Sequence, residues 1–107
     1  RNSQLEATMN LVTYYHGTKD FDGVMNAIVG NGKLRNGFHL TPDMEVAKNY
    51  GRVIAITLEA DLTKAHVGTI NKEGNMNKAV GNGIEVVLKT EAAVNELYYN
   101  LYDAVAA

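Results

Sequence analysis

The stretch NGFHLTPDMEVAKNYGRVIAITLE, residues 36–59, predicts a strand, a helix and a second strand in close succession. We expect a short strand over Asn36–Leu40. In Thr41-Pro42, a hydroxyl at the cap position and a proline at the first helical position predict a helix start, and this helix should close near Tyr50-Gly51. Arg52–Glu59 is rich in branched apolar residues and is typical of a strand. This succession indicates a sheet whose strands are joined by short helices.

The residues before this stretch continue the same pattern. Leu11–Tyr15 is β-branched and aromatic, which predicts a buried strand that stops at Gly17. Asp20 or Asp22 can cap a short helix that runs to Ile28. A strand, a helix and a strand therefore precede the second helix.

The second half of the chain adds further strands and one ambiguous region. Between Asp61 and Val80 the pattern is weak, with a short strand expected around His66–Gly68. Glu85–Lys89 predicts another strand. After Glu91 the apolar spacing fits a helix, yet Val94–Tyr99 also fits a strand, and we expect a strand followed by a helical end. Strands interleaved with short helices predict an α+β fold.

The composition is that of one globular domain. A chain of 107 residues, 46 % hydrophobic and 21 % charged, can bury a core without disulfide bonds. We expect a polar leader over residues 1–10 and a single domain over residues 11–107. Ten basic residues against twelve acidic ones give a net charge of −2, which argues against a general electrostatic affinity for nucleic acid. Since the first residue is Arg1, we expect a fragment or a processed form.

Several kinds of chemistry are excluded by what the sequence lacks. There is no cysteine, so disulfides, thiol catalysis and cysteine-ligated zinc are ruled out. Ser3 is the only serine, and Gly30-Asn31-Gly32 does not continue into a dinucleotide fingerprint. His16, His39 and His66 have no second histidine at metal-binding spacing, so no metal site is expected. Chemistry would depend on histidine, carboxylate, tyrosine and backbone groups.

Three segments carry the candidate functional residues: Tyr14–Thr18 (YYHGT), Gly37–Tyr50 (GFHLTPDMEVAKNY) and Gly81–Leu88 (GNGIEVVL). Each has an ordinary structural reading when taken alone. The histidine of the first segment can be a turn residue, the second can be a strand and a capped helix, and the glutamate of the third can be solvated. The order of the three segments along the chain and the spacing within them are more specific to a function than any one segment alone.

Together the segments resemble the signature elements of NAD-dependent ADP-ribosyltransferases of the diphtheria-toxin and poly(ADP-ribose) polymerase type. Such enzymes carry His-Gly-Thr/Ser on the first strand and an aromatic pair two and thirteen residues after a glycine. A glutamate at the start of a late strand completes the set. Here the glycine is Gly37, the pair is His39 and Tyr50, and the glutamate is Glu85. The resemblance extends from about Tyr14 to Tyr98.

The resemblance implies a fold, a co-substrate and a set of site residues. The implied fold is the ADP-ribosyltransferase fold, an α+β domain with two small, mostly antiparallel sheets flanking an NAD cleft. The implied catalytic residues are Glu85, His16 and His39. The implied NAD-binding residues are His16, Gly17, Thr18, His39, Ala47 and Tyr50.

Each implied role has a physical basis. Gly17 would hold the carboxamide of NAD with its backbone, and His16 would bind ribose hydroxyls. Tyr50 would stack on the nicotinamide ring. Glu85 would stabilise the oxocarbenium-like transition state and could orient or deprotonate the acceptor. One cation of the group Lys33, Arg35, Lys48 and Arg52 would meet the pyrophosphate, and the others would be solvated.

Three positions depart from the pattern of the family. His39 stands where a tyrosine is usual, and Ala47 stands where the polymerase-like members have serine. Gly83 stands where arginine-modifying members have Glu or Gln, which disfavours arginine as the acceptor. The resemblance thus implies transfer of ADP-ribose from NAD to a macromolecular, non-arginine acceptor. Because a chain of this length has no room for polymer-binding insertions, we expect the transfer of one ADP-ribose unit.

The expected setting is a monomeric bacterial or phage effector or toxin in the cytoplasm of the producing or target cell, with a possible inhibitor or immunity protein. No signal peptide or membrane-length apolar run is present in the sequence. Three alternatives stay open: an NAD glycohydrolase, a catalytically inactive NAD- or ADP-ribose-binding module, and a purely structural domain.

Overall fold

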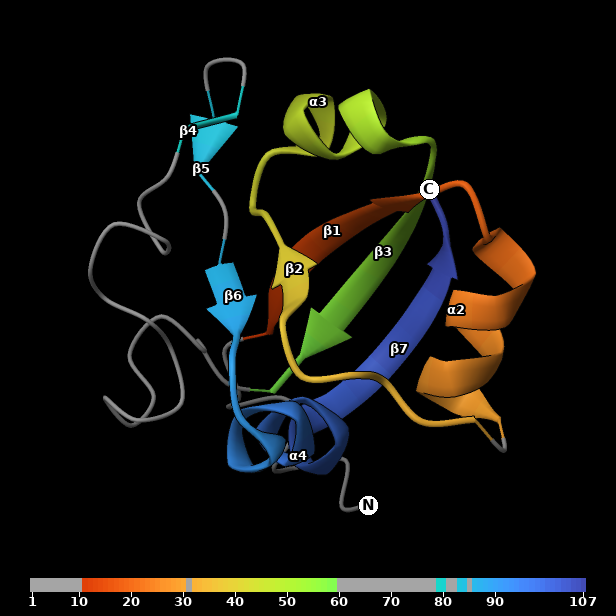
Figure 1. Ribbon diagram of the computed structural model, residues 1–107, viewed down its shortest axis with the longest axis vertical. Coiled ribbons are helices and arrows are strands. Elements are labelled where there is room, and N and C mark those ends of the chain that lie inside the picture. Colours follow the sequence, from red (N-terminus) through yellow and green to blue (C-terminus); the bar gives the residue numbers. More distant parts are fainter. Residues whose placement is uncertain (1–10, 31, 60–78, 81–82, 85) are drawn as a thin grey trace.

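The computed structural model describes residues 11–30, 32–59, 79–80, 83–84 and 86–107 (Figure 1). In chain order its elements are β1 (Val12–Thr18), α2 (Phe21–Val29), β2 (Phe38–Leu40), α3 (Met44–Ala47), a 3₁₀ turn (Lys48–Tyr50), β3 (Arg52–Leu58), β4 (Ala79–Val80), β5 (Gly83–Ile84), β6 (Val86–Leu88), α4 (Glu91–Asn100) and β7 (Leu101–Ala106). Their strand pairings are antiparallel. The expectation of an α+β domain with small antiparallel sheets is confirmed. The leader over residues 1–10 and the strand expected at His66–Gly68 lie outside the described residues.

Strand β3 is the centre of a three-stranded sheet with the order β1-β3-β7. Its register with β1 runs from Val12↔Leu58 to Thr18↔Arg52. β2 pairs with β6, and β4 pairs with β5. Figure 1 shows β2 beside β1 and β6 beside β2. Helix α3 lies at one end of the three-stranded sheet, α4 lies at the opposite end, and α2 lies along β7.

The core is built on one face of β3, where Ile54, Ile56 and Leu58 are each 0 % exposed. Alternate residues of a strand share a face, so these three side chains point together into the core. Each fully buried Ile or Leu contributes roughly 1.5–3 kcal/mol to folding. The other buried members of the core are Tyr14, Ile28, Leu34, Leu40, Val86, Leu88, Ala93, Val94 and Leu97. Within the described ranges, no helix has the length and apolar character to cross a bilayer.

The β2–β6 sheet meets the three-stranded sheet at the outer edge of β1. The N–H of Tyr15 donates to the carbonyl of Thr41 (2.7 Å), and the N–H of Thr41 donates to the carbonyl of Tyr15 (2.9 Å). Thr41 directly follows β2, so this bridge joins the β2–β6 sheet to the three-stranded sheet. The junction of β1 with β2 and Thr41 is called the seam below.

Several local predictions are confirmed. Asp20 caps α2, because its carboxylate accepts from the N–H of Gly23 (3.2 Å), and the helix ends at Gly30. The turn after α3 closes at Gly51, whose φ of 135° is in the region that favours glycine. β3 occupies almost the whole stretch expected for it.

The order of elements after Glu91 is the reverse of the prediction. Helix α4 comes first and strand β7 second. Thr90 caps α4 by accepting from the N–H of Ala93 (3.1 Å), and Ala93 and Leu97 are buried. The strand follows because Leu101–Ala106 pairs with β3. That pairing is distant along the chain, so the local apolar spacing does not reveal it.

Two further predictions about boundaries are wrong. β1 does not stop at Gly17, because Gly17 pairs with Val53 as part of the strand. Helix α3 begins after Asp43 rather than at Thr41, and the carboxylate of Asp43 caps it by accepting from the N–H of Glu45 (2.9 Å). The seam holds the backbone of Thr41 in an extended pairing, which displaces the helix start along the chain.

Candidate functional site

A cavity of about 170 Å³ lies at the seam, where β1, β2 and the end of α3 converge. We call it the seam cavity. The described residues that line it are Tyr15, His16, Gly17, His39, Thr41, Ala47 and Tyr50. Of the residues that the sequence nominated, the structure therefore brings together His16, Gly17, His39, Ala47 and Tyr50.

The backbone of Gly17 presents a hydrogen-bond donor and an acceptor at this cavity. The amide groups of a strand alternate between its two edges, so Gly17 and Tyr15 share an edge. Tyr15 uses that edge to bind Thr41 across the seam. The N–H and C=O of Gly17 are next in line along it, at the cavity. Such a pair complements a primary carboxamide, which carries both an acceptor oxygen and donor hydrogens.

Only glycine fits at position 17 with this packing. An ideal Cβ there would lie 1.8 Å from the carbonyl oxygen of Ala47 and 3.1 Å from the Cβ of Tyr50. Ala47 is itself 1 % exposed. The end of α3 therefore rests directly on β1, which holds the 3₁₀ turn and its tyrosine against the cavity.

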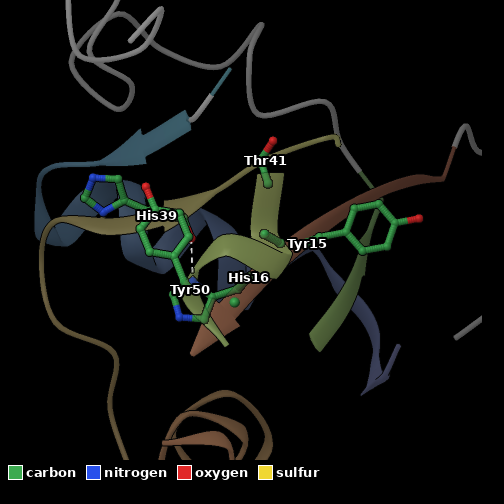
Figure 2. A pocket seen from close by; sticks show the side chains of 7 residues that line it. Tyr15, His16, His39, Thr41 and Tyr50 are labelled. Carbon is green, nitrogen blue, oxygen red and sulfur yellow. Dashed lines mark hydrogen bonds between the residues drawn. The ribbon is translucent and has the colours of Figure 1, made fainter. Parts of the chain in front are cut away.

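Aromatic side chains form part of the cavity wall. Figure 2 shows the rings of His16, His39 and Tyr50 gathered on one side of the view, whereas the ring of Tyr15 points away from them. Tyr15 therefore borders the cavity through its backbone. Tyr50 is 41 % exposed, so a flat ligand entering the cavity can reach its ring. Stacking between such rings is favourable beyond the apolar area that it buries.

Residues of β2 contact the ring of His16. Its Nδ1 lies 2.6 Å from the backbone carbonyl oxygen of His39, shown by the dashed line in Figure 2. Its face stacks on Phe38, with ring centroids 4.1 Å apart and an angle of 23° between the planes. These contacts come from β2, so they tie the side chain across the seam.

A second cavity, of about 300 Å³, adjoins the first at His16, which lines both. Its walls come from α2 and from the loop before β2, and they include Lys33 and Arg35. The ammonium of Lys33 pairs with Glu91 at 3.0 Å, and both side chains are well exposed. This second cavity therefore has cationic groups at its rim.

The other two cations of the predicted group lie elsewhere. Lys48 pairs with Glu45 at 2.9 Å on the exposed side of α3. The guanidinium of Arg52 lies 3.8 Å from the centroid of the Phe21 ring. Lys33 and Arg35 are thus the members of the group that border the cavity beside His16.

Two further predicted site residues are Thr18 and Glu85. Thr18 is half-buried on β1 and does not line the cavity; its hydroxyl accepts from the N–H of Asp20 (2.9 Å). Glu85 lies outside the described residues. Its sequence neighbour Val86 pairs with Leu40, the last residue of β2.

Sequence reasoning missed two lining residues, Tyr15 and Thr41. The strand alternation contains a signal for Tyr15, because it shares an edge with Gly17. Thr41 is buried, at 3 % exposed. No local sequence pattern predicts its position at the cavity, because that position depends on the backbone bridge to Tyr15 on a distant segment.

Among the described residues, no group of three His, Asp or Glu side chains could hold a metal ion. Comparisons with protein-family models, with curated proteins and with solved structures found no match to this chain. The chemistry and geometry of the seam cavity, together with the order of its segments along the sequence, are therefore the grounds for a function.

Proposed function

We propose that this chain is an NAD-dependent mono-ADP-ribosyltransferase with the ADP-ribosyltransferase fold, and that the seam cavity binds the nicotinamide of NAD. The observation that carries the proposal is the backbone edge of Gly17 beside the ring of Tyr50 in one cavity. The glycine edge complements the carboxamide, and the tyrosine offers a face for the pyridine ring. The resemblance in segment order supports the same assignment.

The volume of the seam cavity is close to that of a cavity that holds one aromatic ring. An apolar cavity of roughly 150 Å³ holds a benzene molecule, and the seam cavity measures about 170 Å³. Sites for larger, drug-sized ligands usually measure roughly 300–1,000 Å³. The rest of the dinucleotide would occupy the adjoining cavity of about 300 Å³, where Lys33 and Arg35 can meet the pyrophosphate.

The proposed reaction breaks the bond between nicotinamide and ribose. The bonding electrons leave with nicotinamide, which departs as a neutral molecule, and the anomeric carbon gains oxocarbenium character. A nucleophilic atom of the acceptor then bonds to that carbon, and its proton goes to a base or to water. Gly17 and Tyr50 would orient the leaving ring, and His16 would bind the ribose at the junction of the two cavities.

Glu85 enters this proposal on sequence grounds. It directly precedes β6, whose first residue pairs with β2. Its carboxylate would bind the 2′-hydroxyl of the ribose and stabilise the positive charge that grows in the transition state. Because Gly83 replaces the second acidic or amide residue of arginine-modifying enzymes, the proposed acceptor is a macromolecule modified at another group. The proposed setting is a bacterial or phage effector acting in a cytoplasm.

Binding of nicotinamide is tested by isothermal calorimetry, with nicotinic acid as the matched ligand. Nicotinic acid should bind at least about tenfold more weakly, because its carboxylate cannot donate to the carbonyl of Gly17. The variant Tyr50→Phe should bind nicotinamide like the parent, whereas Tyr50→Ala should bind it up to about tenfold more weakly. Equal binding of both ligands, or no binding of nicotinamide, would contradict the proposal.

Catalysis is tested by incubating the chain with NAD labelled in its ADP-ribose half, with and without cell extract. Label on a macromolecule supports transfer, and the variant Glu85→Gln should abolish it. Free ADP-ribose as the sole product would instead identify an NAD glycohydrolase. NAD binding without any turnover would identify a binding module.

A further inference from the structure

We infer that Phe38 is a positioning residue, which holds the His16 ring at the junction of the two cavities in the orientation that a ribose hydroxyl requires. This inference rests on the proposed function. It starts from contacts that His16 makes with β2: the stack on Phe38 at 4.1 Å and the hydrogen bond to the carbonyl of His39 at 2.6 Å.

The carbonyl contact selects one tautomer of His16. A carbonyl oxygen can only accept, so Nδ1 of the ring must donate its proton to it. In the neutral ring Nε2 is then the acceptor nitrogen. A ribose hydroxyl that donates its proton needs an acceptor of this kind.

The stack on Phe38 restrains the plane of the His16 ring, which the hydrogen bond alone does not do. One hydrogen bond restrains the distance from Nδ1 to the carbonyl oxygen but leaves the ring some freedom to rotate about its side-chain torsions. The nearly parallel face of Phe38, at 23° to the imidazole, also fixes the plane of the ring. Together the stack and the hydrogen bond restrain the direction in which Nε2 points.

The side chain of Phe38 is suited to this task by its place in the fold. It lies on β2 in register with Leu88, is half-buried, and packs against the core. It also lines the second cavity together with His16. An aliphatic side chain could fill the same place against the core, but only a planar ring can lie flat against an imidazole.

The orientation of His16 is tested without any ligand by ¹H–¹⁵N spectra that report histidine tautomers, recorded at a pH where the ring is neutral. The parent protein should show His16 with its proton on Nδ1, and loss of that signal in His16→Asn assigns it. A proton on Nε2 would overturn the inference. This measurement does not depend on NAD.

The role of Phe38 is tested by comparing the affinities for NAD and for nicotinamide in Phe38→Leu and Phe38→Tyr. Phe38→Leu should raise the Kd for NAD about three- to tenfold and leave the Kd for nicotinamide, which has no ribose, close to that of the parent. Phe38→Tyr keeps a stacked ring and should restore NAD binding. Melting temperatures establish that both variants fold.

The failure of this inference is distinguishable from the failure of the proposed function. If the parent binds neither NAD nor nicotinamide, the proposed function fails. If the parent binds both but Phe38→Leu matches it for NAD, or weakens both ligands equally, Phe38 does not position His16.

Discussion

At the residue scale, the seam cavity depends on position 17 being a glycine, which has no side chain. Gly37 and Gly51 have φ values of 92° and 135°, so their backbones call for glycine. Gly17 is a glycine for a different reason: it lies in a regular strand, and the carbonyl of Ala47 occupies the space that a Cβ would need. The close approach of α3 to β1 brings the ring of Tyr50 to the strand edge.

The variant Gly17→Ala tests this packing. Its new methyl group would force the backbone of α3 away from β1, and overpacking of this kind costs about 1–3 kcal/mol of unfolding free energy. Nicotinamide affinity should fall as well, because the cavity changes shape. Urea unfolding and calorimetry measure the two effects.

The matched control is Gly37→Ala, where an ideal Cβ meets no atom within 4 Å but the φ of 92° is unfavourable. This variant should lose stability to a similar extent, about 1–3 kcal/mol, and keep its nicotinamide affinity. Unchanged nicotinamide binding by Gly17→Ala would show that the contact with Ala47 does not shape the cavity.

At the element scale, the phenol of Tyr98 connects α4 to the loop that borders the second cavity. The hydroxyl of Tyr98 accepts from the N–H of Leu34 (2.9 Å) and donates to the carbonyl of Ala27 at the end of α2 (2.6 Å). The ion pair of Lys33 with Glu91 joins the same elements, but it is exposed. Exposed ion pairs contribute only about 0–1 kcal/mol to the free energy of unfolding. Of these two contacts between α4 and the loop, the hydrogen bonds of Tyr98 should therefore contribute more to stability.

We predict that Tyr98→Phe lowers the unfolding free energy by about 1–3 kcal/mol, because it removes the partner of the N–H of Leu34, a residue that is 6 % exposed. Exchange of the Leu34 amide hydrogen should also become faster. The neighbouring variant Tyr99→Phe is the control: its side chain is 86 % exposed, so its stability should change by less than about 0.5 kcal/mol. Equal stability of the two variants would contradict this role of Tyr98.

At the scale of the whole molecule, the candidate site exists because two sheets meet along one edge of β1. The seam cavity takes Gly17 from the three-stranded sheet and His39 from the β2–β6 sheet, and the bridge between Tyr15 and Thr41 aligns them. A ligand in the cavity would touch both sheets at once. It would therefore oppose any opening of the seam.

This coupling predicts a pattern of hydrogen exchange. At a nicotinamide concentration of ten times its Kd, the amides of Tyr15 and Thr41 should both exchange about tenfold more slowly. The amide of Ala93 in α4, at the far end of the sheet (Figure 1), is the control and should change less. Slower exchange on only one side of the seam would show that the ligand does not join the two sheets.

Much of the local structure follows from the sequence by itself. The apolar pattern of Arg52–Glu59, the cap at Asp20 and the glycine after Tyr50 depend on near neighbours, and the corresponding elements are present. The resemblance of three sequence segments to the ADP-ribosyltransferase signatures also nominated His16, Gly17, His39, Ala47 and Tyr50, and these residues line one cavity. Local energetics suffice at these positions because strand preference and helix capping act within a few residues.

Other features were decided only by the tertiary structure. The order of α4 and β7 depends on pairing with β3, and the start of α3 depends on the bridge that holds Thr41. The contact of Ala47 with Gly17 and the stack of His16 on Phe38 likewise join distant segments. Such contacts form only when the chain folds back on itself, so no short window of sequence contains them. The sequence therefore indicated most of the residues that line the seam cavity, and packing between the sheets determined how they meet.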